Sequence, residues 1–73
     1  MAINRRLKAA RVARGLTQLQ LAEKVGKKEI EISRYETGRA IPDAATAYRI
    51  AAALGCKRIE IGLTPYGVNG RTV

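Results

Sequence analysis

The chain lacks the residues on which most catalytic and metal sites depend. Its 73 residues include no histidine and a single cysteine, so neither a His/Cys metal site nor an internal disulfide is expected. A phosphate-binding loop is also missing, because Gly26-Lys27-Lys28 has neither the upstream glycine nor the Ser/Thr of a P-loop. Glu29 and Glu31 are the only close acidic pair, and at that spacing on a helix they point in different directions. We therefore expect no enzyme activity, no cofactor and no metal.

Long apolar runs and large aromatic residues are scarce as well. No run approaches the about 20 residues that span a bilayer, and the N-terminus lacks the apolar core of a signal peptide. With the lone Cys56, this predicts a cytoplasmic protein without a membrane partner. Phe and Trp are absent and many apolar residues are alanines, which predicts a small, closely packed core. Such a short chain buries only about 60% of its unfolded surface, so pairing with a second chain would add stability.

Positive charge, by contrast, is in excess. The chain has 14 Lys and Arg against 6 Asp and Glu, which gives a net charge of +8 in 7.9 kDa. A charge of this size predicts attraction to a polyanion. Ribosomal and membrane-surface proteins carry similar charge, so the charge alone does not identify the polyanion.

Residues 16–38 predict two short helices joined by a turn. Thr17 can cap the first helix, and Gln20 completes the spacing of a capping box. Gly26 tolerates the left-handed conformation in which helices end, and the second helix must begin shortly after it. Two helices joined by a glycine-containing turn are the layout of a DNA-reading helix-turn-helix.

Two further helices flank this motif. Asn4 can cap a helix that runs to about residue 13, and Asp43 can cap another over about residues 44–54, which Gly55 ends. We therefore expect four helices within residues 1–56.

The hydrophobic period changes after the fourth helix. Ile59, Ile61 and Leu63 alternate with polar or small residues, which is typical of a half-buried strand. Since no other segment offers a partner strand, we predict that 57–65 is a dimerisation strand that pairs with its copy in a second chain. The competing interpretation is a short fifth helix, which the isoleucines and glycine disfavour. Residues 66–73 are expected to form a flexible tail.

These residues resemble the Xre/Cro helix-turn-helix family, which includes lambdoid phage repressors, restriction-system controller proteins and antitoxins. The matching motifs are T-Q-x-x-L-A at 17–22, I-S-R-Y-E-x-G at 32–38 and A-x-x-L-G at 51–55, with Leu7, Arg11, Gly26 and Pro42 at fitting positions. The resemblance covers residues 3–56. It implies a mainly α, lambda-repressor-like domain that binds a palindromic operator in double-stranded DNA as a homodimer, usually as a repressor.

The segment L-G-C-K-R-I-E-I-G-L-T-P at 54–65 looks like the HipB-type antitoxins, in which a C-terminal strand pairs across the dimer. That resemblance implies a dimer contact through Ile59, Ile61 and Leu63. It also implies a toxin protein as a further partner and autoregulation of the operon.

The family resemblance also implies the DNA-binding residues. The bases would be read from the second motif helix by Lys28, Glu29, Ile30, Ser33 and Arg34. These types fit the major groove, where Arg34 can bind guanine, Glu29 can accept from cytosine N4 and Ile30 can meet a thymine methyl.

Phosphate contacts are implied for Gln18, Lys27 and Arg39. Arg11 and Glu36 resemble the ion pair that joins the first and third helices in the family, so Glu36 is expected to be structural rather than base-reading.

The start of the second motif helix departs from the family pattern. Lys27 and Lys28 stand where the family usually has an apolar residue and then Ser or Thr, so the second motif helix lacks an obvious side-chain cap and its first turn is expected to be loose. The same fold could instead be a protein-interaction module that binds a toxin or a transcription partner. A conspicuous exposed apolar patch would favour that module, and the sequence suggests only Ile30 and Leu19.

Overall fold

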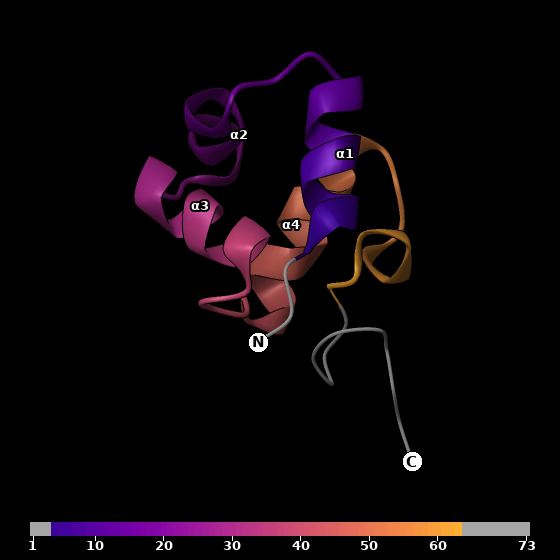
Figure 1. Ribbon diagram of the computed structural model, residues 1–73. Helices are drawn as coiled ribbons and strands as arrows, with labels where there is room; N and C mark the ends of the chain where they lie inside the picture. The colour runs from indigo at the N-terminus through magenta and orange to yellow at the C-terminus, as the bar shows by residue number, and fades with distance from the viewer. Residues whose placement is uncertain (1–3, 64–73) are drawn as a thin grey trace.

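The computed structural model describes residues 4–63, apart from the side chain of Ile59. Within this range the chain forms four α-helices and one 3-10 turn, namely α1 (Arg5–Ala13), α2 (Gln18–Val25), α3 (Glu29–Thr37), α4 (Ala44–Leu54) and η1 (Arg58–Ile61) (Figure 1). The predicted mainly helical class with four helices is confirmed. None of the helices in the described range is long and apolar enough to cross a membrane. The predicted tail, residues 66–73, lies outside the described residues.

The helix ends follow from local chemistry. The Asn4 side chain accepts a hydrogen bond from Leu7 N at 3.0 Å, and Asp43 accepts one from Thr46 N at 2.8 Å. The bond from the Thr46 backbone also lowers the pKa of the Asp43 carboxyl, because it stabilises the charged form. Gly55 ends α4 at φ 67°, in the left-handed region that glycine enters without steric cost.

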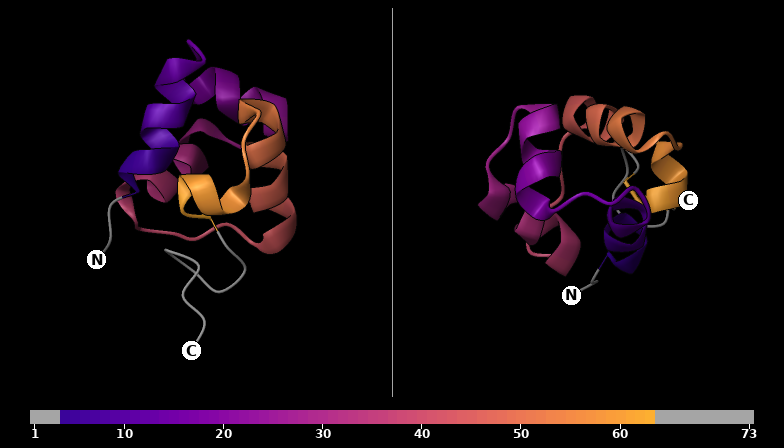
Figure 2. Two further views of the ribbon diagram at one scale, coloured as in Figure 1. Left: turned by 90° about the vertical axis from the view of Figure 1, so that its right-hand side faces the viewer. Right: turned by 90° about the horizontal axis from the view of Figure 1, so that it is seen from above.

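The core lies between the four helices and η1. Its largest fully buried side chains come from every element and are Leu7, Leu21, Ile32, Ile50 and Ile61. Ala22, Ala47 and Ala51 are also buried, and such small side chains let neighbouring helices approach closely. Figure 2 shows the helices enclosing this interior, with η1 beside α1 and α4.

The strand predicted for 57–65 is wrong where the structure describes it, because Arg58–Ile61 forms η1. Its backbone pairs locally, since Glu60 N donates to Lys57 O at 3.0 Å and Leu63 N to Arg58 O at 2.9 Å. Ile61 and Leu63 are only 2% and 3% exposed and pack into the core of their own chain. The alternation of apolar residues in this segment therefore reflects a tight turn that folds back onto the core. The burial of Ile61 and Leu63 needs no second copy.

Asn4 fastens this C-terminal turn to the rest of the domain. Its Nδ2 donates to Ile61 O at 2.8 Å, and its backbone N donates to Glu36 O at 2.9 Å. A Cβ on Gly62, which has φ +71°, would lie 3.3 Å from the Asn4 amide. One buried residue thus joins the start of α1 to the end of α3 and to η1.

Candidate nucleic-acid interface

The α2–turn–α3 unit is built as the sequence predicts. Thr17 Oγ1 accepts from Gln20 N at 3.0 Å, and Gln20 Oε1 accepts from Thr17 N at 2.8 Å, which completes the capping box. Gly26 ends α2 in the left-handed conformation at φ 71°. The inner faces of the two helices are buried against each other, so their other faces point outward.

The start of α3 is held more firmly than its sequence suggests. Lys28 occupies the N-cap position and makes no side-chain capping bond, as expected from an ammonium group that cannot accept. Glu31 Oε1 instead accepts from Lys28 N at 2.9 Å, which supplies the reciprocal half of a capping box. A carboxylate at this position also interacts favourably with the helix dipole.

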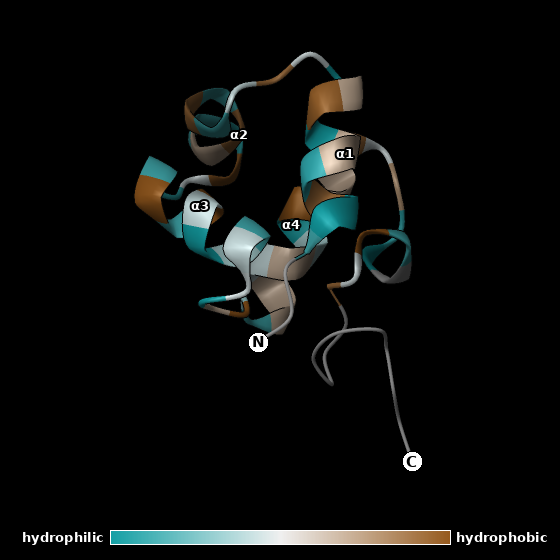
Figure 3. Cartoon of the chain, in the orientation of Figure 1, coloured by the Kyte–Doolittle hydropathy of each residue, from teal (hydrophilic) through white to brown (hydrophobic). Residues whose placement is uncertain are grey.

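The proposed base-reading residues line one accessible side of α3. Lys28, Glu29, Ile30 and Arg34 are exposed, Ile30 by 54%, and Ser33 is half-buried. Their spacing places Ile30 and Arg34 one turn apart on the same face. Among the described residues the Arg34 guanidinium has no hydrogen-bond or ion-pair partner. The N-terminal turn of α3 shows one apolar band among hydrophilic ones (Figure 3).

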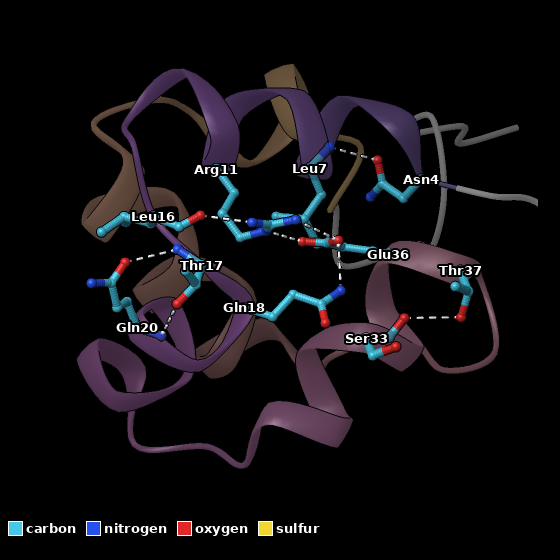
Figure 4. A network of polar contacts seen from close by, with 10 residues as sticks. All are labelled: Asn4, Leu7, Arg11, Leu16, Thr17, Gln18, Gln20, Ser33, Glu36 and Thr37. Carbon is cyan, nitrogen blue, oxygen red and sulfur yellow. Dashed lines mark hydrogen bonds and ion pairs between the residues drawn. The ribbon is translucent and has the colours of Figure 1, made fainter.

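The three expected phosphate ligands differ in their surroundings. Arg39 is exposed in the loop after α3, and Lys27 is half-buried in the turn between α2 and α3. Gln18 begins α2, and its Nε2 donates to Glu36 Oε1 at 3.0 Å (Figure 4). A primary amide has two N–H donors, so this bond leaves one of them for a phosphate.

Arg11 and Glu36 lie together beneath this surface. Arg11 Nε donates to Glu36 Oε2 at 2.6 Å and Arg11 Nη2 to Glu36 Oε1 at 3.2 Å. Arg11 Nη1 donates to Leu16 O at 2.6 Å. The two side chains are only 9% and 4% exposed. The network therefore connects α1, the entry of α2 and the last turn of α3 (Figure 4).

Besides the bond from Lys28 N to Glu31, sequence reasoning missed two further features of the structure. The bond from Gln18 to Glu36 joins residues far apart in the chain, and no local pattern announces it. Three large apolar side chains beyond Ile30 and Leu19 are also exposed, namely Val12 by 57%, Ile41 by 59% and Tyr48 by 67%. The exposure of Tyr48 was predictable from the sequence. Tyr48 lies next to the helical positions of the core residues on α4 but is not one of them.

The residues predicted to form the dimer contact are placed differently from the expectation. Ile61 and Leu63 lie in the core of their own chain, and the side chain of Ile59 is outside the described part of the structure. The described part of this segment is therefore not a strand that could pair with a second copy. Because the likeness to HipB-type antitoxins depended on that strand, the expected toxin partner loses its structural support.

The sequence of this chain is similar to those of several known proteins. The chain is 41% identical over 51 residues to human "Endothelial differentiation-related factor 1". The aligned residues cover 70% of this chain and 34% of that protein. It is 39% identical over 57 residues to "Multiprotein-bridging factor 1" of Candida albicans, covering 78% of this chain and 38% of the relative. An "Uncharacterized HTH-type transcriptional regulator" of Methanothermobacter thermautotrophicus is 50% identical over 46 residues, with coverage of 63% and 67%.

The chain thus spans about a third of the length of the first two of these relatives. No solved structure matches it significantly. The family model described as Helix-turn-helix matches residues 7–61, which include α1 from Leu7 onward and the whole of α2, α3, α4 and η1. With its capped α2, left-handed Gly26 and outward α3, the chain belongs to the Xre-type helix-turn-helix family.

Proposed function

We propose that this protein is a sequence-specific DNA-binding transcription regulator that inserts α3 into the major groove. The observation that carries the proposal is the outer face of α3, which is exposed within residues 4–63, in a helix-turn-helix of the matched family. Cationic side chains flank that face, with Lys27 and Lys28 before α3 and Arg39 after it. This arrangement supports phosphate contacts on both sides of a helix that reads bases.

The base contacts follow from side-chain chemistry. Arg34 would donate two hydrogen bonds to guanine O6 and N7, and Glu29 would accept from cytosine N4. Ile30 would pack on a thymine methyl, with Lys28 and Ser33 reading neighbouring edges. None of these roles requires the backbone of α3 to move, because the side chains already point away from the core.

Gln18 would bind a phosphate in an orientation set by Glu36. The carboxylate of Glu36 accepts a hydrogen bond from one amide N–H of Gln18 at 3.0 Å. This bond fixes the direction of the second amide N–H of Gln18. The N-terminus of α2 also favours an anion. In this proposal Arg11 and Glu36 act as positioning residues and touch no DNA themselves.

The regulator would bind a palindromic operator as a homodimer and repress by occupying it. A candidate contact lies beside the loop after α3, where Ile41 is 59% exposed. It adjoins a hollow of about 210 Å³ whose apolar lining includes Tyr35, Ala40 and Leu63. In such a homodimer the two α3 helices would enter successive major grooves, about 34 Å apart.

Selection of bound duplexes from a random pool tests the proposal directly. We expect an enriched palindrome with half-sites separated by about one helical turn. An enriched sequence without twofold symmetry would refute the homodimer on a palindrome but not DNA reading. A pool that shows no enrichment would refute sequence-specific binding.

The affinity for the selected duplex is expected to fall steeply with salt. If two subunits neutralise about four to eight phosphates, the log–log slope should lie near −4 to −7. Arg39→Ala should make the slope shallower by about one to two and weaken all sequences alike, because it removes one phosphate contact per subunit. Fluorescence anisotropy across a salt series measures this, and a slope near zero would contradict phosphate binding.

Arg34→Ala is expected to relax the preference at one base pair in each half-site. Losing a two-bond contact to guanine should weaken specific binding by about 1–3 kcal/mol per contact, while affinity for random DNA changes little. Arg39→Ala serves as the matched control, since it also removes an exposed arginine. Base preferences that are the same in wild type and Arg34→Ala would mean that α3 does not lie in the major groove as proposed.

A second candidate function is a protein-interaction module that bridges DNA-bound and other proteins. Two observations favour it. One relative is named a multiprotein-bridging factor, and Tyr48 on α4 is 67% exposed. In this version the chain binds DNA and a partner at the same time through different surfaces.

A further inference from the structure

A second hollow lies between the C-terminal half of α4 and η1. It has a volume of about 330 Å³ and is lined by Tyr48, Ala51, Ala52, Cys56, Lys57 and Arg58. We call it the α4–η1 groove. Two views show α4 and η1 on a different side of the domain from the N-terminal end of α3 (Figure 2). A molecule in this groove would not occupy the surface assigned to DNA.

The inner part of the groove is apolar. Buried Ala51 forms part of its lining, and Tyr48 stands beside it, 67% exposed. Burial raises the pKa of the Cys56 thiol, with Glu60 adding to the rise and Arg14 opposing it, so Cys56 is a neutral, weakly polar group at neutral pH. A surface helix usually turns polar side chains outward, but the exposed residues of α4 are Ala44, Ala45, Tyr48, Arg49 and Ala52.

The edge of the groove is positive. Lys57 is exposed there, and Arg58 lies half-buried next to it. The Arg14 guanidinium lies close to Gly55, since a Cβ on that glycine would be 2.6 Å from Arg14 Nη2. The carboxylate of nearby Glu60 accepts a hydrogen bond from Lys57 N at its Oε1, at 2.7 Å. The potential of this edge therefore favours a negatively charged ligand.

We propose that the α4–η1 groove binds an acidic amphipathic helix of a protein partner, with an apolar side chain packed between Tyr48 and Ala52. Its carboxylates would lie against Lys57 and Arg58. An apolar interior with a charged rim is how grooves recognise amphipathic helices. A second copy of this chain fits this groove less well, because it would bring more positive charge to the edge formed by Lys57 and Arg58. A DNA duplex fits less well because it presents phosphates but no apolar side chain for the interior.

The test uses a fluorescein-labelled synthetic helix of about 15 residues, with leucines at i, i+4 and i+7 and glutamates on its other face. Fluorescence anisotropy should show saturable binding to the full chain. A peptide with glutamine in place of every glutamate should bind at least about tenfold more weakly, because the complementary charge is lost. Tyr48→Ala should weaken binding about tenfold or more, since exposed aromatic anchors dominate such contacts.

Matched substitutions outside the groove distinguish binding in the groove from general effects of lost apolar surface or changed net charge. Val12→Ala removes a side chain that is 57% exposed on α1 and should leave peptide binding unchanged. Arg58→Glu should weaken binding more than Lys8→Glu, which changes net charge equally on exposed α1. Circular dichroism of each variant establishes that it is folded. Equal binding by Tyr48→Ala and Val12→Ala would overturn the proposal.

Two further results would assign the groove to another occupant and so overturn the proposal. The first is sedimentation showing a dimer that Tyr48→Ala dissociates, which would make a second copy the occupant. The second is displacement of the peptide by the selected DNA duplex. We expect instead that the protein–DNA complex binds the peptide as tightly as the free protein does. Since the peptide assay needs no DNA, its failure and a failure to bind an operator are distinguishable.

Discussion

Ile61→Ala is expected to destabilise the domain by about 2–5 kcal/mol, the range for removing a buried isoleucine or leucine side chain. Ile61 is only 2% exposed and packs in the core, and its carbonyl accepts from Asn4 Nδ2 at 2.8 Å. A domain of 73 residues has a total stability of about 4–11 kcal/mol. The substitution therefore removes a large part of the margin, and urea denaturation followed by circular dichroism measures the loss.

Ile30→Ala is the matched control, because it deletes the same atoms from a side chain that is 54% exposed. Its unfolding free energy should stay within about 0.5 kcal/mol of the wild type. Because Ile61 is buried within its own chain, the cost of Ile61→Ala should not depend on protein concentration. A cost that grows with concentration would instead indicate that Ile61 stabilises an association between copies.

Glu36→Ala should be the other severe substitution, costing about 3–5 kcal/mol. It would leave the buried Arg11 guanidinium without its carboxylate, to which it donates at 2.6 and 3.2 Å. It would also free the Gln18 amide, which donates at 3.0 Å. Thermal and urea unfolding measure the effect, and wild-type stability would contradict a structural role for the pair.

Glu23→Ala, an exposed substitution on α2, controls for loss of one negative charge and should change stability by less than about 0.5 kcal/mol. The double variant Arg11→Met, Glu36→Leu should recover much of the loss, because removing both charges leaves neither buried alone. Recovery remains partial, since Leu16 O loses its donor at 2.6 Å. In the folded double variant, affinity for DNA should fall with base preferences unchanged, because Gln18 is no longer oriented.

Some features of this fold follow from residues close together in the sequence, and others depend on contacts between distant residues. The starts and ends of the helices were predictable, because each depends on residues a few positions apart. Thr17 with Gln20, Asp43 with Thr46, and Gly26 at its positive φ act within one turn of chain. The lack of a side-chain cap at Lys28 was also predictable, but the compensating bond from Glu31 was overlooked.

The segment after α4 was not predictable in the same way. Alternating apolar residues fit both a half-buried strand and a tight turn that folds onto a core, since the pattern is only a few residues long. What separates the two is the packing of η1 against α1 and α4, the burial of Ile61 and Leu63 in the core, and the distant Asn4 amide, which donates to the Ile61 carbonyl. None of these is visible in a window of local sequence.

The sequence by itself determined the four helices, the helix-turn-helix between residues 16 and 38, and the family to which the chain belongs, because short-range capping, periodicity and motif spacing encode them. Only the tertiary structure decided that residues 58–61 form η1, that Gln18 is held by Glu36, and that α4 and the residues after it line a groove. The physical reason is that burial and hydrogen bonding between distant residues depend on how the helices pack. Local propensities specify each helix, but its neighbours decide which of its faces stays in contact with solvent.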